Sequence, residues 1–561
     1  MDRESRGATA SIMKLWSLKH RTILIVDDFP EMRSALRSML IPWQPDRIET
    51  ARNGDDAIEK LQQSRFDIIL CDYNLGEGKD GQQILEEARY RNLLPFSSAF
   101  IMVSAETNAQ MVMGAMEQQP DGYISKPVTK VSLQVRLKKF VQKQDELRKI
   151  TRAMDRKQYP AAVELIDRYL EDRHKYRFEL YKLKSDLLIR SGDLERAQNL
   201  CEAVLAGREL PWARFDIGRI AFFHQDYPRA ATVFEQLLEG NPTFIAAYDW
   251  LAKVRERLGD TEQAQQALME GIERSPHSLL RQRALAELAD RNEDLDACEV
   301  ARRKAVRIGK GSILRAPADY AALAHVLLQR EASTEALRIA TSINAEFEHS
   351  PLAKLEAATV TSQVYSAQGN EKESASALAD ALAIATQQPE LVSANVGMSL
   401  ARSCLAHDRR EDADRIIRQV ICDNDDNEGI LAQVTHLYTE AGSGDAINTL
   451  IEATRKEIVS INNEGVKLLK NGETEASIEL FTRAARGMPH NPVINLNAAQ
   501  SLVSQMRGSG ASRPALAQAL GYIRAAGENE THRERQNRLL TTCRELAATL
   551  PAETESGQEI T

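Results

Sequence analysis

The 561-residue sequence predicts an α/β domain with a doubly wound, five-stranded parallel sheet, followed by an all-α superhelical domain of stacked helical repeats. Short apolar runs alternate with amphipathic segments between residue 21 and about residue 142. After about residue 147 the strand signals disappear, and helix–turn–helix stretches recur with a regular period. A chain of this length also requires several hydrophobic cores or an extended array.

Five apolar runs predict the strands of the first domain, and they cover residues 22–26, 47–51, 68–71, 100–103 and 122–124. Segments with helical periodicity lie near residues 31–41, 54–64, 80–91, 107–118 and 128–145. Strands that alternate with helices through short loops are typical of βαβ units. The pattern therefore predicts a parallel sheet with helices on both faces.

Three stretches define the repeat: RSGDLERAQNLCEAVL, FHQDYPRAATVFEQLLEGNP and RLGDTEQAQQALMEGIERSP. Each has a turn with Gly or Asp, then a small residue where two helices approach, then an apolar helix. Ala197, Ala230 and Ala264 recur at a nearly constant interval, and Pro242 and Pro276 share it. A helix–turn–helix unit with this period of about 34 residues resembles the tetratricopeptide repeat. Such units stack into a superhelix whose groove binds proteins or peptides.

The match to this repeat is closest in two adjacent units and again near the C-terminus. The matching positions are Gly218, Ala230, Phe234 and Pro242, then Ala252, Ala264 and Pro276, and finally Gly465, Phe481, Ala484 and Pro489. Between them, candidates for equivalent turns are Ala297, Ala336, Ser374 and Ala413, and the intervals between these candidates are longer than the regular period. We expect about nine or ten hairpins, and the boundaries between about 280 and 450 stay open.

These patterns set the expected domain limits. We expect a flexible N-terminal extension over residues 1–20, the α/β domain over 21–143, the repeat domain over 144–550 and a disordered tail over 551–561. The helix expected from residue 129 to about residue 154 contains no Pro or Gly, so it runs from the first domain into the first repeat. We interpret it as a coupling element between the two domains.

Composition narrows the class of protein. A formal net charge of -9 does not favour sequence-independent binding to nucleic acid. The six cysteines lie far apart and form no CxxC, which excludes a zinc-ligand pattern and suits a reducing compartment. No apolar run approaches the ~20 residues needed to cross a bilayer, and the N-terminal segment has no continuous apolar core of a secretion signal. We expect a cytoplasmic protein without membrane insertion.

Acidic residues end two of the predicted strands. ILIVDD closes the first strand with Asp27 and Asp28, and IILCD closes the third with Asp72. The carboxyl ends of parallel strands face the crevice where ligands bind. Three converging carboxylates repel one another unless a cation lies among them, and oxygen ligands favour Mg²⁺. The sequence therefore predicts a magnesium site at this edge of the sheet.

Two further residues follow the last two strands. IMVSAE places Ser104 after the fourth strand, and YISKP places Lys126 after the fifth, where a cis peptide at Pro127 would aim the lysine. A lysine charge beside a carboxylate suits an incoming phosphoryl group, because phosphoryl transfer depends mainly on positioning and charge neutralisation.

The set of strand-end residues resembles the motif of the response-regulator receiver family. The matching positions are Asp27, Asp28, Asp72, Ser104, Lys126 and Pro127, and the resemblance covers roughly residues 20–143. It implies that Asp72 is the phospho-acceptor, which attacks a phosphohistidine on a partner kinase. It also implies that Asp28, Asp72 and the backbone carbonyl of Asn74 bind Mg²⁺, with Asp27 assisting through water.

The same resemblance assigns roles around the phosphoryl group. Lys126 would pair with the phosphoryl oxygens, and Ser104 would hydrogen-bond the phosphate and draw its loop inward. Tyr123 would be the coupled aromatic switch, although a permanently packed tyrosine is the alternative. The segment DYNLGEGKDG departs from the family, because it has Gly76 where Pro is usual and one extra residue before Gly81. The shape of this loop therefore stays open.

The expected function is that of a two-component response regulator. A partner histidine kinase or phosphotransfer protein would phosphorylate Asp72, and the repeats would bind a partner protein in a phosphorylation-dependent way, or homodimerisation would change. The alternative is a constitutive assembly scaffold whose receiver serves as a phosphate sink or localisation module. No kinase, cyclase or phosphodiesterase motif and no DNA-binding module is recognisable, so we expect neither an enzyme nor a nucleic-acid-binding protein.

Two surface hypotheses concern the helical part. Trp212, Phe215, Arg219 and Phe222 fall on the first helix of a repeat, on the side that usually lines the groove. Aromatics with an arginine are typical binding anchors, but an aromatic stripe at helical spacing is more often core. A basic stretch comprises Arg136, Lys138, Lys139, Lys143, Arg148 and Lys149. It is either a contact for an acidic partner or a solvated helix face.

Overall fold

The computed structural model describes residues 16–105, 117, 120–171, 174–527 and 532–550. Most of the helix expected near 107–118 and the tail expected over 551–561 lie outside these residues. Contacts divide the chain into two compact units, residues 1–319 and 320–561.

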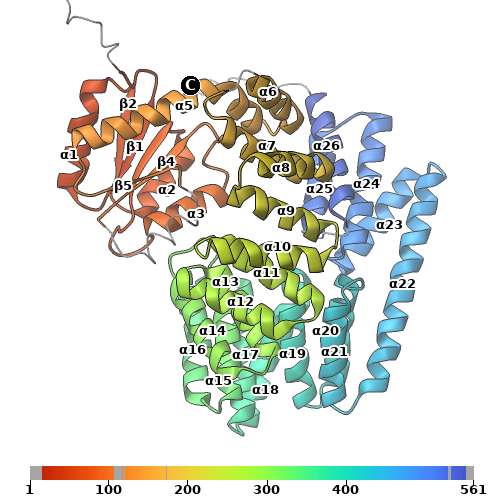
Figure 1. Ribbon diagram of the computed structural model, residues 1–561. Helices are drawn as coiled ribbons and strands as arrows, with labels where there is room; N and C mark the ends of the chain where they lie inside the picture. Colours follow the sequence, from red (N-terminus) through yellow and green to blue (C-terminus); the bar gives the residue numbers. More distant parts are fainter. Residues whose placement is uncertain (1–15, 106–116, 118–119, 172–173, 528–531, 551–561) are drawn as a thin grey trace, which may run out of the picture. The chain divides into compact units, whose positions relative to one another are not determined.

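The first unit begins with the predicted five-stranded parallel sheet, in the order β2-β1-β3-β4-β5 (Figure 1). The strands are β1 (Thr22–Val26), β2 (Arg47–Ala51), β3 (Ile68–Asp72), β4 (Ala99–Ser104) and β5 (Gly122–Ser125). The register pairs Asp72 with Val103 and Ser104 with Ser125, so the carboxyl ends of these strands meet at one edge. The predicted α/β fold is confirmed.

Helices cover both faces of this sheet. They are α1 (Pro30–Leu40), α2 (Gly54–Gln63), α3 (Gly81–Tyr90) and α5 (Lys130–Asp155). Leu24 and Ile69 belong to the core shared with α2 and α3, whereas Ile23 and Ile68 belong to the core shared with α1 and α5. Alternate residues of one strand thus enter opposite cores, which explains why the central strands read as continuous apolar runs.

The helix α5 is as long as predicted, and the sequence accounts for its start. Thr129 and Ser132 form a capping box, in which each side chain bonds the other residue's backbone N–H. No Pro or Gly interrupts the following 26 residues. Its last residue, Asp155, still contacts the receiver side, because its carboxylate accepts hydrogen bonds from the backbone N of Phe96 and the hydroxyl of Ser97.

Residues 1–15 of the expected N-terminal extension lie outside the described residues, and residues 16–18 contact the α/β domain. Leu18 is fully buried in the core of α1 and α5, and its backbone N donates to the carbonyl of Trp43 at 2.7 Å. Trp16 also packs edge-on against Trp43, in the short helical turn Ile41–Trp43. Residues 16–20 therefore pack with the α/β domain, because apolar contacts continue upstream of β1.

The remainder of the chain is helical. In the first unit the helices are α6 (Tyr159–Glu171), α7 (Arg177–Ser191), α8 (Leu194–Gly207), α9 (Pro211–Phe223), α10 (Tyr227–Gly240), α11 (Ile245–Leu258), α12 (Thr261–Arg274), α13 (Leu279–Arg291) and α14 (Leu295–Gly309). The helix α15 (Pro317–Gln329) crosses the limit between the units. The second unit continues with α16 (Ser333–Glu346), α17 (Pro351–Ala367), α18 (Glu371–Gln387), a 3-10 turn (Pro389–Leu391), α19 (Ala394–Ala406), α20 (Arg410–Asp423), α21 (Glu428–Glu440), α22 (Gly444–Lys470), α23 (Thr474–Gly487), α24 (Pro492–Ser509), α25 (Arg513–Ala525) and α26 (Arg533–Ala548).

A small buried residue lies four positions after the N-cap of the second helix in many of the described hairpins. Ala197, Ala230, Ala264, Ala336, Ser374, Ala413 and Ser477 occupy this position and are fully buried. In α14 the equivalent is Cys298, not the predicted Ala297, because Cys298 is fully buried and Ala297 is partly exposed. Cys298 follows Ala264 by the same interval that separates Ala264 from Ala230, so the regular period extends one unit further than predicted.

Glycines mark the closest helix contacts in the best-matching units. A Cβ at Gly218 would lie 2.6 Å from the ring of Phe234, and a Cβ at Gly465 would lie 2.3 Å from the ring of Phe481. In both pairs the phenylalanine follows the glycine by the same interval, as expected for equivalent repeats. Gly465 lies on the long helix α22, whose first half packs on α21 and whose second half packs on α23. One helix thus serves two neighbouring repeats.

Candidate functional site: an acidic pocket with a lysine

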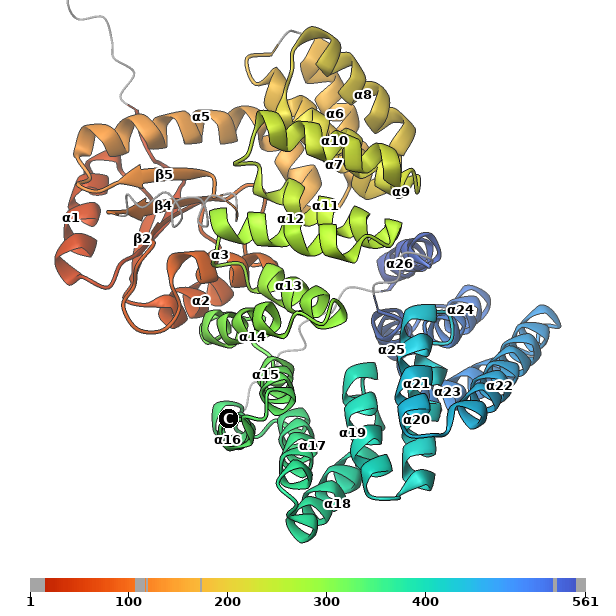
Figure 2. The same ribbon diagram turned by 60° about the horizontal axis from the view of Figure 1, so that its bottom comes forward.

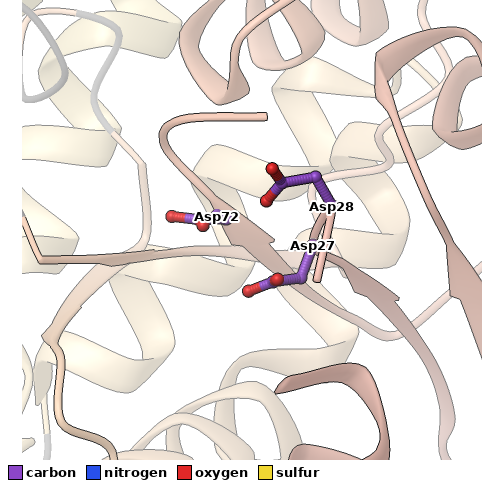
Figure 3. Close-up of side chains that lie close together, drawn as sticks. All are labelled: Asp27, Asp28 and Asp72. Carbon is purple, nitrogen blue, oxygen red and sulfur yellow. The ribbon is translucent and has the colours of Figure 1, made fainter. Parts of the chain in front are cut away.

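The carboxylates of Asp27, Asp28 and Asp72 converge at the carboxyl ends of β1 and β3. Ligand oxygens of all three residues lie within 4.8 Å of one another (Figure 3). Asp27 is 1% and Asp72 6% exposed, and Asp28 is partly buried. The geometry predicted from the strand ends is therefore present, and three negative charges share one small, largely dehydrated volume.

Lys126 binds two of these acids. Its Nζ donates to Asp72 Oδ2 at 2.6 Å and to Asp27 Oδ2 at 3.0 Å. Burial raises the pKa of Asp72, the hydrogen bond and charge of Lys126 oppose this rise, and the charge of Asp27 adds to it. Burial acts to lower the pKa of Lys126, but its bonds to Asp72 and Asp27 outweigh burial, so this pKa is raised. The lysine is therefore cationic at neutral pH.

The donor set fits a hard divalent cation. Asp28 Oδ1 is buried and has no hydrogen-bond partner within the described residues. A buried carboxylate oxygen without a donor is costly, and a metal ion beside it removes that cost. Lys126 supplies one positive charge against three carboxylates, so a second cation is needed to balance the site. Oxygen ligands of this kind favour Mg²⁺.

The loop between Asp72 and α3 has a defined shape. Gly76 (φ 75°) and Gly78 (φ 98°) adopt left-handed conformations that disfavour side chains. The backbone N of Gly81 donates to the carbonyl of Tyr73 at 2.8 Å, which closes the loop against the end of β3. A Cβ at Gly81 would lie 2.3 Å from the carbonyl oxygen of Asp72, so only glycine fits there. The extra residue is accommodated by the two flexible glycines.

The remaining predicted site residues differ in their exposure to solvent. Asn74 is exposed, and its Oδ1 accepts a hydrogen bond from the backbone N of Gly76 at 3.2 Å. Ser104 is 2% exposed at the end of β4, and its carbonyl accepts the backbone N–H of Lys126 at 2.8 Å. Tyr123 on β5 is half-buried against the core shared with α2 and α3. The Lys126–Pro127 peptide is cis.

Arg33 also supports the pocket and was not predicted. Its Nη1 donates to the backbone carbonyls of Asp27 at 2.6 Å and Asp28 at 3.0 Å, from the first turn of α1. Asp27 Oδ1 in addition accepts the backbone N–H of Phe29 at 2.9 Å. These bonds hold the two adjacent acids in place. The signal available in the sequence was an arginine one helical turn after a strand-end acid pair.

The four predicted groove residues of α9 mostly contact neighbouring repeats. Phe222 is buried, and its ring lies 5.3 Å from that of Trp250. Phe215 contacts the rings of three aromatic residues, and Arg219 lies over Phe215 and Trp250 and bonds Asp216 at 3.0 Å. Trp212 is half-buried. The packing agrees with a core role for Phe222 and leaves the other three partly accessible.

Five members of the basic stretch on α5 are exposed, and Lys143 is partly buried. The exposed members are Arg136, Lys138, Lys139, Arg148 and Lys149. Within the part of the chain that the structure describes, none of the helices is long and apolar enough to cross a membrane.

Comparison with known proteins agrees with both parts of the chain. The family "Response regulator receiver domain" matches residues 23–138, and the family "Tetratricopeptide repeat" matches residues 245–278, which include α11 and α12. Chemotaxis protein CheY-3 of Vibrio cholerae serotype O1 is 30% identical over 125 residues, which are 22% of this chain and 95% of that protein. Chemotaxis protein CheY of Pseudomonas aeruginosa is 29% identical over 121 residues, 22% of this chain and 96% of that protein.

Solved structures include similar chains. Chemotaxis protein CheY4 of Vibrio cholerae is 25% identical and covers 21% of this chain and 98% of its own, with a TM-score of 0.20. The sheet order, the acids at the ends of β1 and β3 and the lysine after β5 occur in the region that matches the family and these relatives over nearly their whole length. The protein therefore belongs to the response regulators, with a receiver domain at residues 23–138 joined to tetratricopeptide-type repeats.

Proposed function

We propose that a partner histidine kinase or phosphotransfer protein phosphorylates this response regulator on Asp72, and that its repeat domain binds a partner protein in a phosphorylation-dependent way. The observation that carries the proposal is the position of the Asp72 carboxylate, 2.6 Å from Lys126 Nζ within a cluster of three acids. A negative phosphoryl group beside three carboxylates is unfavourable unless cations offset the repulsion, and Lys126 is one such cation.

The residues of the pocket have distinct roles in the transfer. An Asp72 carboxylate oxygen attacks the phosphorus of a phosphohistidine, so a P–O bond forms while the P–N bond to the imidazole breaks. Lys126 exchanges its bond to Asp72 for one to a phosphoryl oxygen, and the Ser104 hydroxyl donates to another. Asp28, Asp72 and the Asn74 carbonyl would hold Mg²⁺, with Asp27 assisting through water; the ion supplies charge neutralisation during transfer.

The proposed output lies in the repeats. Stacked helical hairpins present an extended groove, and such surfaces bind proteins or peptides. The competing proposal is a constitutive scaffold in which the receiver only drains phosphate from a kinase or localises the protein.

The proposed location of the protein is the cytoplasm. All six cysteines are free and buried, as expected for a reducing compartment. Enzymatic output, nucleic-acid binding and membrane insertion form no part of the proposal.

Affinity capture with the full chain separates the two proposals. Wild type, Asp72→Asn and a control, Asp46→Asn at the amino end of the sheet, are compared with and without beryllofluoride and Mg²⁺. A switch predicts that the mimic changes which proteins co-elute with wild type and Asp46→Asn but not with Asp72→Asn. Identical partners in every condition would leave only the constitutive scaffold.

A further inference from the structure

Carboxylates of the receiver meet the repeats inside the first unit. Glu117 lies on the connection between β4 and β5, and Glu86 lies on α3. Figure 2 shows α3 close to α13 and α14, and Gln83 of α3 donates to the carbonyl of Ile308 at 3.3 Å. A Cβ at Gly311 would lie 2.3 Å from the Gln83 side chain, so the two surfaces approach closely. These contacts join segments that are far apart in the sequence.

Arg281 is the centre of the first contact. Its side chain is 0% exposed, and its Nε and Nη2 bond both oxygens of Asp249 at 2.6 and 2.8 Å. Nη1 donates to the carbonyl of Ser275 at 3.1 Å. A second carboxylate, that of Glu117, bonds Nη2 and also accepts the Ser275 hydroxyl at 2.6 Å. Asp249 already balances the guanidinium charge, so Glu117 occupies a separate position made by Arg281 and Ser275.

This position has the features of a binding site for a carboxylate. Both donors, the Arg281 guanidinium and the Ser275 hydroxyl, belong to fully buried or nearly fully buried residues. Charge-assisted bonds from a fixed guanidinium are the strong and specific kind. Glu117 is itself mostly buried, with 19% of its side chain exposed. Arg281 and Ser275 thus offer donors to a second carboxylate beside the one that Asp249 supplies.

A second receiver carboxylate also accepts the hydroxyl of a serine in the repeats. Glu86 Oε2 accepts the hydroxyl of Ser312 at 2.7 Å. Arg283 is near enough that its charge acts on Glu86, although its own hydrogen bonds go to Asp319 and the Leu314 carbonyl. The receiver therefore presents acids, and the repeats present arginines with serines. This complementarity along one face is typical of a specific docking surface.

We propose that Arg281 and Ser275 form a carboxylate-binding site of the repeat domain, that Glu117 of the receiver is its intramolecular ligand, and that phosphorylation of Asp72 weakens this docking. The last clause rests on the proposed function. Once released, the same site takes a Glu or Asp side chain from an acidic segment of the partner.

Both receiver contacts belong to segments that adjoin strand ends of the phosphoryl site. Glu117 lies between Ser104 and Gly122, the end of β4 and the start of β5. Helix α3, which carries Gln83 and Glu86, begins at Gly81 in contact with the Asp72 carbonyl. A phosphoryl group adds nearly two negative charges at Asp72, and Ser104 and Lys126 must then rearrange around it. We expect this rearrangement to reach both receiver contacts.

Hydrogen–deuterium exchange of the full chain tests the docking. The variants are Glu117→Gln, which keeps the shape and removes the charge, and Glu31→Gln, an exposed control on α1. We expect Glu117→Gln to raise amide exchange at residues 275–283 and 308–312 by roughly tenfold, since a charge-assisted bond is lost. Ser275→Ala should produce a smaller rise, and the double variant should add little to Glu117→Gln. Exchange in these segments that matches the Glu31→Gln control would overturn the docking site.

The second part of the experiment tests the effect of phosphorylation. It uses beryllofluoride with Mg²⁺, a mimic of the phosphoryl group, on wild type and Asp72→Asn. We expect the mimic to raise exchange in the same two segments of wild type only. Protection at residues 72–76 without any change at 275–312 would refute the coupling. If the mimic fails to bind at all, the proposed function fails, while the Glu117→Gln comparison still decides whether the docking site exists.

Discussion

At the scale of single residues, Asp28 differs from its two neighbours in the pocket. Lys126 binds Asp27 and Asp72, whereas Asp28 Oδ1 is buried without a hydrogen-bond donor in the described part of the chain. The carboxylate that lacks a partner is the one that gains most from a metal ion. Asp28 is therefore the residue at which metal binding and stability should be most tightly linked.

We predict that Mg²⁺ stabilises the receiver and that Asp28→Asn removes this effect. A ligand that binds only the folded state adds RT ln(1 + [L]/Kd), about 1.4 kcal/mol when Mg²⁺ is at ten times its Kd. The measurement is urea unfolding with Mg²⁺ or EDTA, followed by tryptophan fluorescence, to which Trp16 and Trp43 of the receiver contribute. Asp55→Asn on the exposed start of α2 is the control. Equal Mg²⁺ responses in wild type and Asp28→Asn would rule out this ligand assignment.

Asp423 in the repeats is a second acid with an unusual environment. It ends α20, its Oδ1 accepts the backbone N–H of His490 at 2.9 Å, and its buried Oδ2 has no partner among the residues described. Burial raises the pKa of Asp423 to about 6, against the opposing bond and charge of His490. Because the folded pKa exceeds the unfolded one, this residue favours folding at low pH and loses that contribution as pH rises through about 6.

We predict that Asp423→Asn removes this pH dependence. Between about pH 5 and about pH 7.5, wild type should lose about 1.4 kcal/mol of unfolding free energy relative to the variant. Chemical unfolding of the full chain at both pH values gives the difference. Asp380→Asn, an exposed change on α18, should leave the pH dependence of wild type intact. A parallel pH response of wild type and Asp423→Asn would contradict the assignment.

At the scale of elements, close helix packing depends on glycine at a few positions. Gly218 on α9 faces the ring of Phe234 on α10, and a Cβ there would lie 2.6 Å from it. Gly207 at the end of α8 has open space around its Cα. The same substitution should therefore have opposite effects at the two sites.

We predict that Gly218→Ala lowers the free energy of unfolding by roughly 1–3 kcal/mol, the usual cost of overpacking. Gly207→Ala should be neutral or stabilising by up to about 1 kcal/mol, because alanine favours the helix. Thermal unfolding of the full chain compares both with wild type. Equal stabilities of the two variants would show that α9 and α10 are not packed as closely as described.

The elements that the sequence predicts well are those with local signals. Apolar runs ended by Asp27, Asp72 and Lys126 mark both the strands and the pocket, because parallel strands bring their carboxyl ends together. The position of Cys298 was missed because Ala297 and Cys298 are both small, and only packing distinguishes them. The loop after Asp72 depends on the torsions of Gly76 and Gly78, which glycine leaves free.

At the scale of the whole chain, contacts between segments distant in the sequence are the features that the sequence does not predict. The helix α5 was predicted as the link between the domains, because it is continuous in sequence. The contact of Glu117 with Arg281 joins distant parts of the sequence and has no local signature. Because 27% of the residues are charged, the chain offers many possible pairs of an acid with an arginine. The sequence alone therefore does not select this pair. The covalent link was therefore predictable, and the docking surface was not.

At this scale the proposed function depends on covalent modification of Asp72, which a small phosphodonor can probe directly. The full chain is incubated with acetyl phosphate and Mg²⁺, the acyl phosphate is trapped by borohydride reduction, and peptides are analysed by mass spectrometry. We expect conversion of Asp72 alone, abolished by EDTA and absent in Asp72→Asn. Persistent absence of modification at Asp72, or modification at another acid while Asp72 stays intact, would contradict it.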